Sequence, residues 1–176
     1  MRIILAYVSS ADGFLTDAAS RQPNEWASPE DQRHFQDLTS SCGVVIIGSN
    51  TYEAHKGLLK PHPEILRIVM TRDPGKYAAH EIRGKIEFTS DSPQEVIAKL
   101  KDHEYKDILL AGGPKLYAQF FAARLITDLE ISVEPVLFGS GISAATGIPS
   151  NIQLKLVDSS PLNRSGTLLL KYKVLY

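Results

Sequence analysis

The chain has 176 residues, of which 43% are hydrophobic and 22% are charged, and its formal net charge is −1. This composition is typical of a soluble domain with its own hydrophobic core, and the balanced charge argues against nucleic acid or an anionic membrane as a partner. The single cysteine excludes an internal disulfide, and no apolar run has the length of a membrane helix or the pattern of a secretion signal. We therefore expect one cytoplasmic domain spanning residues 1–176.

The N-terminal segment predicts a buried strand followed by a long loop. Arg2–Ser9 is an apolar run of the kind found in strands that are covered on both faces. Ser10–Ala27 is polar and contains glycine, proline and asparagine. Structureless segments of this length are uncommon inside a compact domain and are often functional lids.

The first predicted helix begins at Ser28. Ser28 is a preferred N-cap residue, Pro29 suits the first helical position, and Asp31 could reach back to the cap as in a capping box. We expect this helix to turn Phe35 and Leu38 inward.

The rest of the chain continues the alternation and then changes character. Buried strands are predicted at Val44–Ile47, Ile65–Thr71, Lys85–Phe88 and Ile108–Ala111. Helices are predicted to start after Gly48, at Ser92–Pro93 and at Pro114. After about residue 124 only strands are expected, at Asp128–Phe138, Gln153–Val157 and Thr167–Val174. This order predicts an α/β fold with a largely parallel sheet, helices on both faces and an antiparallel edge.

The segment Asp107–Phe121 is the strongest candidate for a ligand site. A short apolar strand runs into Gly112 and Gly113, and Pro114 then opens a helix. Such a turn brings backbone N–H groups and the positive end of a helix dipole close to a phosphate. In the alternative interpretation, the two glycines only allow a tight turn between strand and helix.

The sequence predicts no metal site. The histidines show no metal-ligand spacing with one another or with Cys42. They are His34, His55, His62, His80 and His103.

Several short motifs together resemble the dihydrofolate reductase superfamily, which includes the reductase domain of the bifunctional riboflavin-biosynthesis deaminase–reductase. The motifs are Ser10–Gly13, Trp26 with Ser28–Asp31, Val45–Gly48 with Thr51–Glu53, Met70–Arg72, Ala111–Pro114 with Tyr117, and Pro135–Gly141. The resemblance covers nearly the whole chain. It implies three layers, helix–sheet–helix, around a sheet of about eight mostly parallel strands with an antiparallel C-terminal edge.

The resemblance implies that NADPH binds across the carboxyl edge of the sheet, with the diphosphate on the backbone amides from Gly112 to Leu116. The implied cofactor contacts are Val8, Leu15, Gly48, Ser49, Asn50, Thr51, Thr71, Arg72, Ala111, Gly112, Gly113, Pro114, Lys115, Leu116 and Tyr117. Ser49 stands where the family often has a basic residue for the 2′-phosphate. The expectation of NADPH rather than NADH therefore depends mainly on Arg72, which is otherwise a solvated loop residue.

The resemblance also implies a catalytic pair. Asp31 matches the position of the carboxylate that assists proton delivery to a C=N bond. A carboxyl group can do this in an apolar pocket, because burial raises its pKa. Ser132 falls where a hydroxyl bonds to that carboxylate, and the substrate would contact Val8, Trp26 and Phe35. Alternatively, Asp31 only interacts favourably with the helix dipole on a solvated face.

The substrate is expected to be a small heterocycle, either a pterin or a ribosylaminopyrimidine. Dihydrofolate reductases bind the folate tail with an arginine just before the third strand, where this chain has Ile65, and Arg67 is displaced by two residues. Pro135–Gly141 is closer to the riboflavin branch. Two alternatives remain open: a reductase in which water supplies the proton, and a non-catalytic nucleotide-binding dimer. An apolar edge strand at Thr167–Val174 would permit a homodimer.

Overall fold

A computed structural model describes residues 1–103 and 105–176 and shows an α/β fold built on one mixed sheet. Its strands are β1 (Arg2–Ser10), β3 (Val44–Gly48), β4 (Leu66–Met70), β5 (Ile86–Thr89), β6 (Asp107–Leu110), β7 (Asp128–Glu134), β9 (Gln153–Pro161) and β10 (Leu168–Leu175). They lie in the order β5-β4-β3-β6-β1-β7-β10-β9. The first six strands in this order are parallel to one another, β10 is antiparallel to β7, and β9 is antiparallel to β10. The predicted fold class is confirmed.

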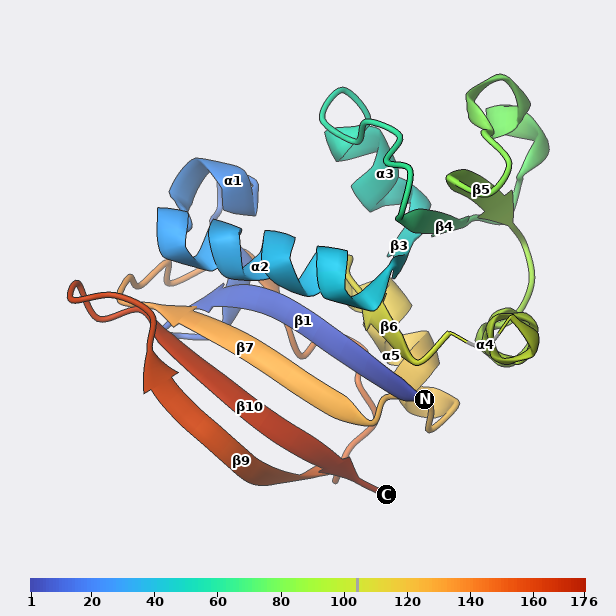
Figure 1. Cartoon of the computed structure of the whole chain (residues 1–176). Coiled ribbons are helices and arrows are strands. Elements are labelled where there is room, and N and C mark those ends of the chain that lie inside the picture. The colour runs from blue at the N-terminus through green and yellow to red at the C-terminus, as the bar shows by residue number, and fades with distance from the viewer. Residues whose placement is uncertain (104) are drawn as a thin grey trace.

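Helices cover both faces of this sheet, which gives three layers (Figure 1). They are α1 (Pro23–Trp26), α2 (Pro29–Cys42), α3 (Ser49–His55), α4 (Pro93–Asp102) and α5 (Pro114–Ala122), with a 3₁₀ helix η1 at Gly75–His80. Buried residues of α2 and α3 belong to one hydrophobic cluster, and those of α4 and α5 belong to the other. Both faces of the central strands are therefore buried from solvent, which explains why those strands are continuous apolar runs.

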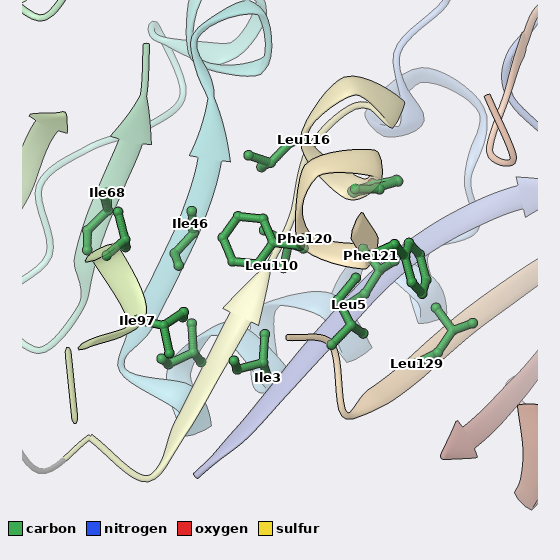
Figure 2. Close-up of a cluster of buried hydrophobic side chains, with 14 of the residues drawn as sticks. Ile3, Leu5, Ile46, Ile68, Ile97, Leu110, Leu116, Phe120, Phe121 and Leu129 are labelled. Carbon is green, nitrogen blue, oxygen red and sulfur yellow. The ribbon is translucent and has the colours of Figure 1, made fainter. Parts of the chain in front are cut away.

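The side-chain alternation of β1 shows how the two cores are filled. Ile3 and Leu5 contribute to the core beneath α4 and α5, whereas Ile4 and Ala6 contribute to the core beneath α2 and α3. Figure 2 shows the first of these cores, where Phe120 of α5 lies among aliphatic side chains of the central strands. Because the core fixes α5 against the sheet, it also fixes the position of the turn that precedes α5.

The N-terminal loop contains structure that was not predicted. A short strand, β2 (Phe14–Thr16), pairs antiparallel with β8 (Ile142–Ser143), and α1 forms a single turn beginning at Pro23. The partner strand lies far along the chain, so nothing local in the sequence indicates the pairing. The predicted lid is thus tied to the loop that follows β7.

The start of α2 confirms one prediction and corrects two. Ser28 is the N-cap, and its Oγ accepts the Asp31 N–H at 3.2 Å. The Asp31 side chain does not complete a capping box; it is buried, and the Ser28 N–H instead donates to Glu134 Oε1 at 2.8 Å. The expectation that Phe35 points inward is wrong, because Phe35 is exposed whereas Leu38 packs against the core.

The C-terminal edge also differs from the sequence expectation. Residues Leu168–Leu175 form β10, which lies between β7 and β9 and therefore has no free edge for pairing with a second copy. The edge is β9, which extends to Pro161 and exposes Leu154, Leu156 and Val157. Among the described residues, no helix is both long and apolar enough to cross a bilayer.

Candidate functional site

The candidate site lies at the carboxyl edge of the parallel strands, where the sheet order changes direction. β1 is flanked by β6 on one side and by β7 on the other, and β6 is followed in the sheet by β3. Because these four strands are parallel, the residues after each strand meet at one edge. Ligands of open α/β sheets bind in the crevice at such a point.

Two glycine turns meet at this edge, and one of them faces open space. A Cβ atom built on Gly112 would lie 3.2 Å from Leu116 Cδ2 and 3.5 Å from both Gly48 N and Thr51 Oγ1. The turn after β6 is thus in contact with the turn after β3. A Cβ atom on Gly113 would meet no atom within 4 Å, so Gly113 faces open space.

The start of α5 presents fewer free amides than expected. The N–H groups of Leu116 and Tyr117 donate to the Gly113 carbonyl at 3.0 and 3.3 Å, and the Gly112 N–H is directed at Tyr117 Oη at 3.4 Å. The expectation that all amides up to Leu116 face a diphosphate is corrected to Gly113 and Lys115, which bond to no group in the described part of the chain. The side chains of Leu116 and Tyr117 are buried in the core and shape the turn from below.

These groups fit a dinucleotide diphosphate. α5 begins with Pro114 and has no side-chain cap, so the positive end of its dipole is not neutralised. The free amides of Gly113 and Lys115, together with the Thr51 hydroxyl, form a set of donors without a carboxylate among them. Such sets are typical of phosphate sites.

The other expected cofactor residues lie along the same edge. Val8, Leu15 and Ala111 are buried, and Ala111 N–H donates to the Ile46 carbonyl at 2.9 Å, which holds the end of β6 against β3. The register places Gly48 beside Met70, so the starts of α3 and of the loop after β4 are neighbours. In this region Ser49 and Thr71 are half-buried, and Asn50 and Arg72 are exposed.

Asp31 is the buried carboxyl group of the site. It is 7% exposed, and burial raises its pKa above the usual range of aspartate. The Ser132 hydroxyl opposes this shift as a hydrogen-bond partner, the charge of Glu134 increases it, and His34 lowers it. The alternative that Asp31 lies on a solvated face is therefore wrong.

The strand register brings Ser132 to the floor of this site. Ser132 on β7 pairs with Val8 on β1 and with Leu169 on β10, and all three side chains are buried. Trp26 lies at the end of α1, and its ring packs edge-on against Phe138 with the centroids 4.9 Å apart. Its indole Nε1 is buried and has no partner among the described residues, so it can still bind an acceptor.

Sequence reasoning missed Glu134, which ends β7 on the same face as Ser132. Glu134 is 6% exposed, and its oxygens accept the Ser28 N–H at 2.8 Å and the Thr167 hydroxyl at 2.7 Å. The sequence does contain a signal for it. Glu130, Ser132 and Glu134 are polar residues at every second position of one strand, so they share one face of the sheet.

The lid is anchored by a second carboxylate that was not singled out. Asp12 accepts the N–H groups of Phe138 at 3.1 Å and Gly139 at 2.7 Å, and the Ser10 hydroxyl at 2.6 Å. The Ser10 hydrogen bond is the largest of the effects that lower the pKa of Asp12. The loop after β1 and the loop after β7 are thus joined above the site.

Arg67 does not replace the missing folate-tail arginine. Its side chain is half-buried on β4, burial lowers its pKa, and its Nη1 donates to the Lys60 carbonyl at 3.0 Å. This arginine holds the segment before β4 in place.

Comparison with known proteins matches this chain to one family. The profile of the RibD C-terminal domain family matches residues 1–167. The uncharacterized protein YyaP of Bacillus subtilis is 24% identical over 97% of this chain and 94% of its own length.

Two solved structures have the same fold. A deaminase/5-amino-6-(5-phosphoribosylamino)uracil reductase of Thermotoga maritima superposes with a TM-score of 0.78 at 15% identity, over 98% of this chain and 56% of that one. Dihydrofolate reductase of Enterococcus faecalis, solved with NADP(H), superposes with a TM-score of 0.67 at 16% identity, over 98% of this chain and 94% of that one. At these low sequence identities, the similarity shows a shared fold and nothing beyond it.

Proposed function

Because the chain belongs to the RibD C-terminal domain family, we propose that it is an NADPH-dependent reductase of a C=N bond in a small heterocycle, either a pterin or a ribosylaminopyrimidine. The observation that carries the proposal is the pairing of two features at one sheet edge. A carboxyl group with a raised pKa, Asp31, lies at the start of α2. A turn suited to a diphosphate lies at the start of α5.

The glycine turn would hold the cofactor through its backbone. The amides of Gly113 and Lys115 and the hydroxyl of Thr51 would donate to the diphosphate, and the ends of β1 and β6 at Val8 and Ala111 would flank the nicotinamide. When bound, NADPH supplies the hydride. The lid, joined to the loop after β7 through Asp12, would exclude water from the reacting atoms.

Asp31 would supply the proton that the imine nitrogen needs. A buried carboxyl group with a raised pKa keeps its proton nearer to neutral pH than an exposed aspartate does. That proton would move from Asp31 Oδ to the nitrogen. The carboxylate that remains would accept a hydrogen bond from the Ser132 hydroxyl. Ser132 thus stabilises the ionised form and orients the group.

Gly113→Ala is expected to weaken NADPH binding by about tenfold, or about 1.4 kcal/mol. The new methyl group would enter the open space that the diphosphate needs, while the free protein would accommodate it without a contact. Calorimetric titration with NADPH measures the effect. Gly57→Ala is the matched control, because a Cβ there also meets no atom within 4 Å and α3 separates it from the turn. Equal NADPH affinities for both variants would contradict the diphosphate assignment.

Arg72→Gln is expected to lower the affinity for NADPH by about tenfold and leave the affinity for NADH unchanged. Arg72 is exposed in the loop after β4 and forms no ion pair with a described residue. It is therefore available for a 2′-phosphate. Titrations with the two dinucleotides check this, and a parallel loss for both would show that Arg72 does not read the 2′-phosphate.

The activity is tested by NADPH consumption with dihydrofolate and with 5-amino-6-(5-phosphoribosylamino)uracil, side by side. Oxidation of NADPH with one of the two supports the proposal and identifies the substrate class. If the protein binds NADPH and oxidises it with neither, the reductase assignment fails and the non-catalytic nucleotide-binding alternative takes its place.

A further inference from the structure

Glu134 is a buried carboxylate without a cation. Its Oε1 accepts the Ser28 N–H and its Oε2 accepts the Thr167 hydroxyl, and no lysine, arginine or histidine of the described chain forms an ion pair with it. Two oxygens that both accept hydrogen bonds are typical of an ionised group. Burial of a charge without an opposite charge nearby costs free energy, so its presence requires an explanation.

Its hydrogen bonds join three segments that are far apart in sequence. Ser28 caps α2, and its Oγ in turn accepts the Asp31 N–H at 3.2 Å. Thr167 is the residue immediately before β10, and its N–H donates to Asn163 Oδ1 at 3.1 Å. Glu134 therefore takes the place that Asp31 would have in a capping box, and this frees the Asp31 side chain to point into the site.

The surroundings of Asp31 single out Glu134 among the charges near it. The charged groups on the elements around Asp31 are Glu30, Arg33, His34 and Asp37 on α2, Asp128, Glu130 and Glu134 on β7, and Lys171 and Lys173 on β10, of which Asp128 and Lys173 pair with each other. The loop before β10 adds the neutral Asn163 and Thr167. The charged side chain of β1 on this face, Arg2, is at the opposite end of the strand and is paired with Asp107.

Most of these charges are already paired. His34 Nε2 lies 2.9 Å from Glu130 Oε2, and Lys171 Nζ lies 3.7 Å from the same oxygen. Glu30 accepts from Asn163 at 3.2 Å and does not contribute to the shift of Asp31. Glu134 is thus the fully buried carboxylate near Asp31 that forms no ion pair with a described residue, whereas Glu30 is only half-buried.

We propose that Glu134 is a positioning residue that orders the first turn of α2 in place of an Asp31 capping box, and that the carboxyl groups of Glu134 and Asp31 are coupled through their shared buried site. Two carboxyl groups that share a buried site resist simultaneous ionisation, so a proton is retained on the one with the weaker hydrogen-bond support. The link to catalysis rests on the proposed function, whereas the coupling between the two groups does not.

The coupling is tested by NMR titration of the full chain labelled with ¹³C at the aspartate and glutamate carboxyl groups. The Asp31 resonance is identified by its loss in Asp31→Asn, and the Glu134 resonance by its loss in Glu134→Gln. We expect Glu134→Gln to lower the Asp31 midpoint by about one pH unit. Glu30→Gln, the matched control on the same turn, should leave the midpoint in place. An Asp31 midpoint that is unchanged in Glu134→Gln overturns the proposal.

The wild-type protein supplies a second measurement that does not depend on a variant that folds. Coupled groups respond to each other, so the Glu134 resonance should change at the pH at which Asp31 titrates. If Glu134→Gln does not fold, Glu134 is assigned by its through-space contacts to Thr167, and a resonance that does not respond to Asp31 overturns the proposal.

The pH profile of kcat/KM separates this inference from the proposed function. If both hold, Glu134→Gln moves the alkaline limb to lower pH by the same amount as the NMR midpoint. If the NMR midpoint moves and the limb does not, the coupling stands and the assignment of Asp31 as proton donor fails.

Discussion

Asp31→Asn is expected to lower turnover by roughly 10²- to 10⁴-fold, the usual effect of losing a positioned general acid. The amide has nearly the same shape as the carboxyl group, so the site should keep its geometry and lose only the proton. NADPH affinity should be unchanged, because the carboxyl group lies at α2 and the diphosphate turn at α5. Steady-state kinetics and a cofactor titration measure the two quantities separately.

Asp37→Asn is the matched control, because Asp37 is an exposed aspartate on the same helix. Its turnover should equal that of the wild type. A loss within about twofold for Asp31→Asn would show that water supplies the proton, because general-acid catalysis contributes at least 10²-fold in typical cases.

The pH dependence of activity and stability gives Asp31→Asn a second signature. The protonated carboxyl group is the active form, so wild-type kcat/KM should fall as pH rises through the raised pKa of Asp31, and the variant should lack this limb. Folding raises this pKa, so the folded state binds the proton more tightly than the unfolded state. Stability then decreases as pH rises from the usual pKa of aspartate to the raised value. Above that window Asp31→Asn should unfold at higher denaturant concentration than the wild type.

Gly141→Ala is expected to reduce the free energy of unfolding by about 2–4 kcal/mol. Gly141 has φ +148°, and a Cβ atom there would lie 1.8 Å from the Thr16 carbonyl oxygen and 2.8 Å from the Thr16 carbonyl carbon. Backbone cannot move away as a flexible side chain can, so β2 and β8 would have to separate. The lid would then lose one of its attachments to the segment after β7, and activity should fall together with stability.

Gly139→Ala provides the control for backbone strain alone. Gly139 also has a positive φ, +70°, but a Cβ there would meet no atom within 4 Å. We expect a loss of about 1–2 kcal/mol, the cost of the left-handed conformation. Urea unfolding of both variants measures the difference, and equal losses would contradict a role for the close approach of Gly141 to Thr16.

Local patterns in the chain were sufficient for the sheet and for part of the site. β1, β3 and β6 are buried on both faces, so each is a continuous apolar run that stands out from its neighbours. The start of α2 was visible because Ser28 and Pro29 satisfy or remove N–H groups within one turn. The turn at Gly112 and Gly113 could also be predicted, because its geometry depends on residues that are adjacent in sequence.

Features that depend on contacts between distant segments were not visible in the chain. The pairing of β2 with β8 joins segments that are separated in sequence by β3 to β7. The position of β9 at the sheet edge depends on the pairing of β10 with β7. The role of Glu134 is of the same kind, because its partners Ser28 and Thr167 come from segments far before and after it. A buried charge is identified by what surrounds it in space. The chain thus specified which segments form strands and helices, and packing specified which carboxyl group accepts the Ser28 N–H at the start of α2 and which one is buried without that bond.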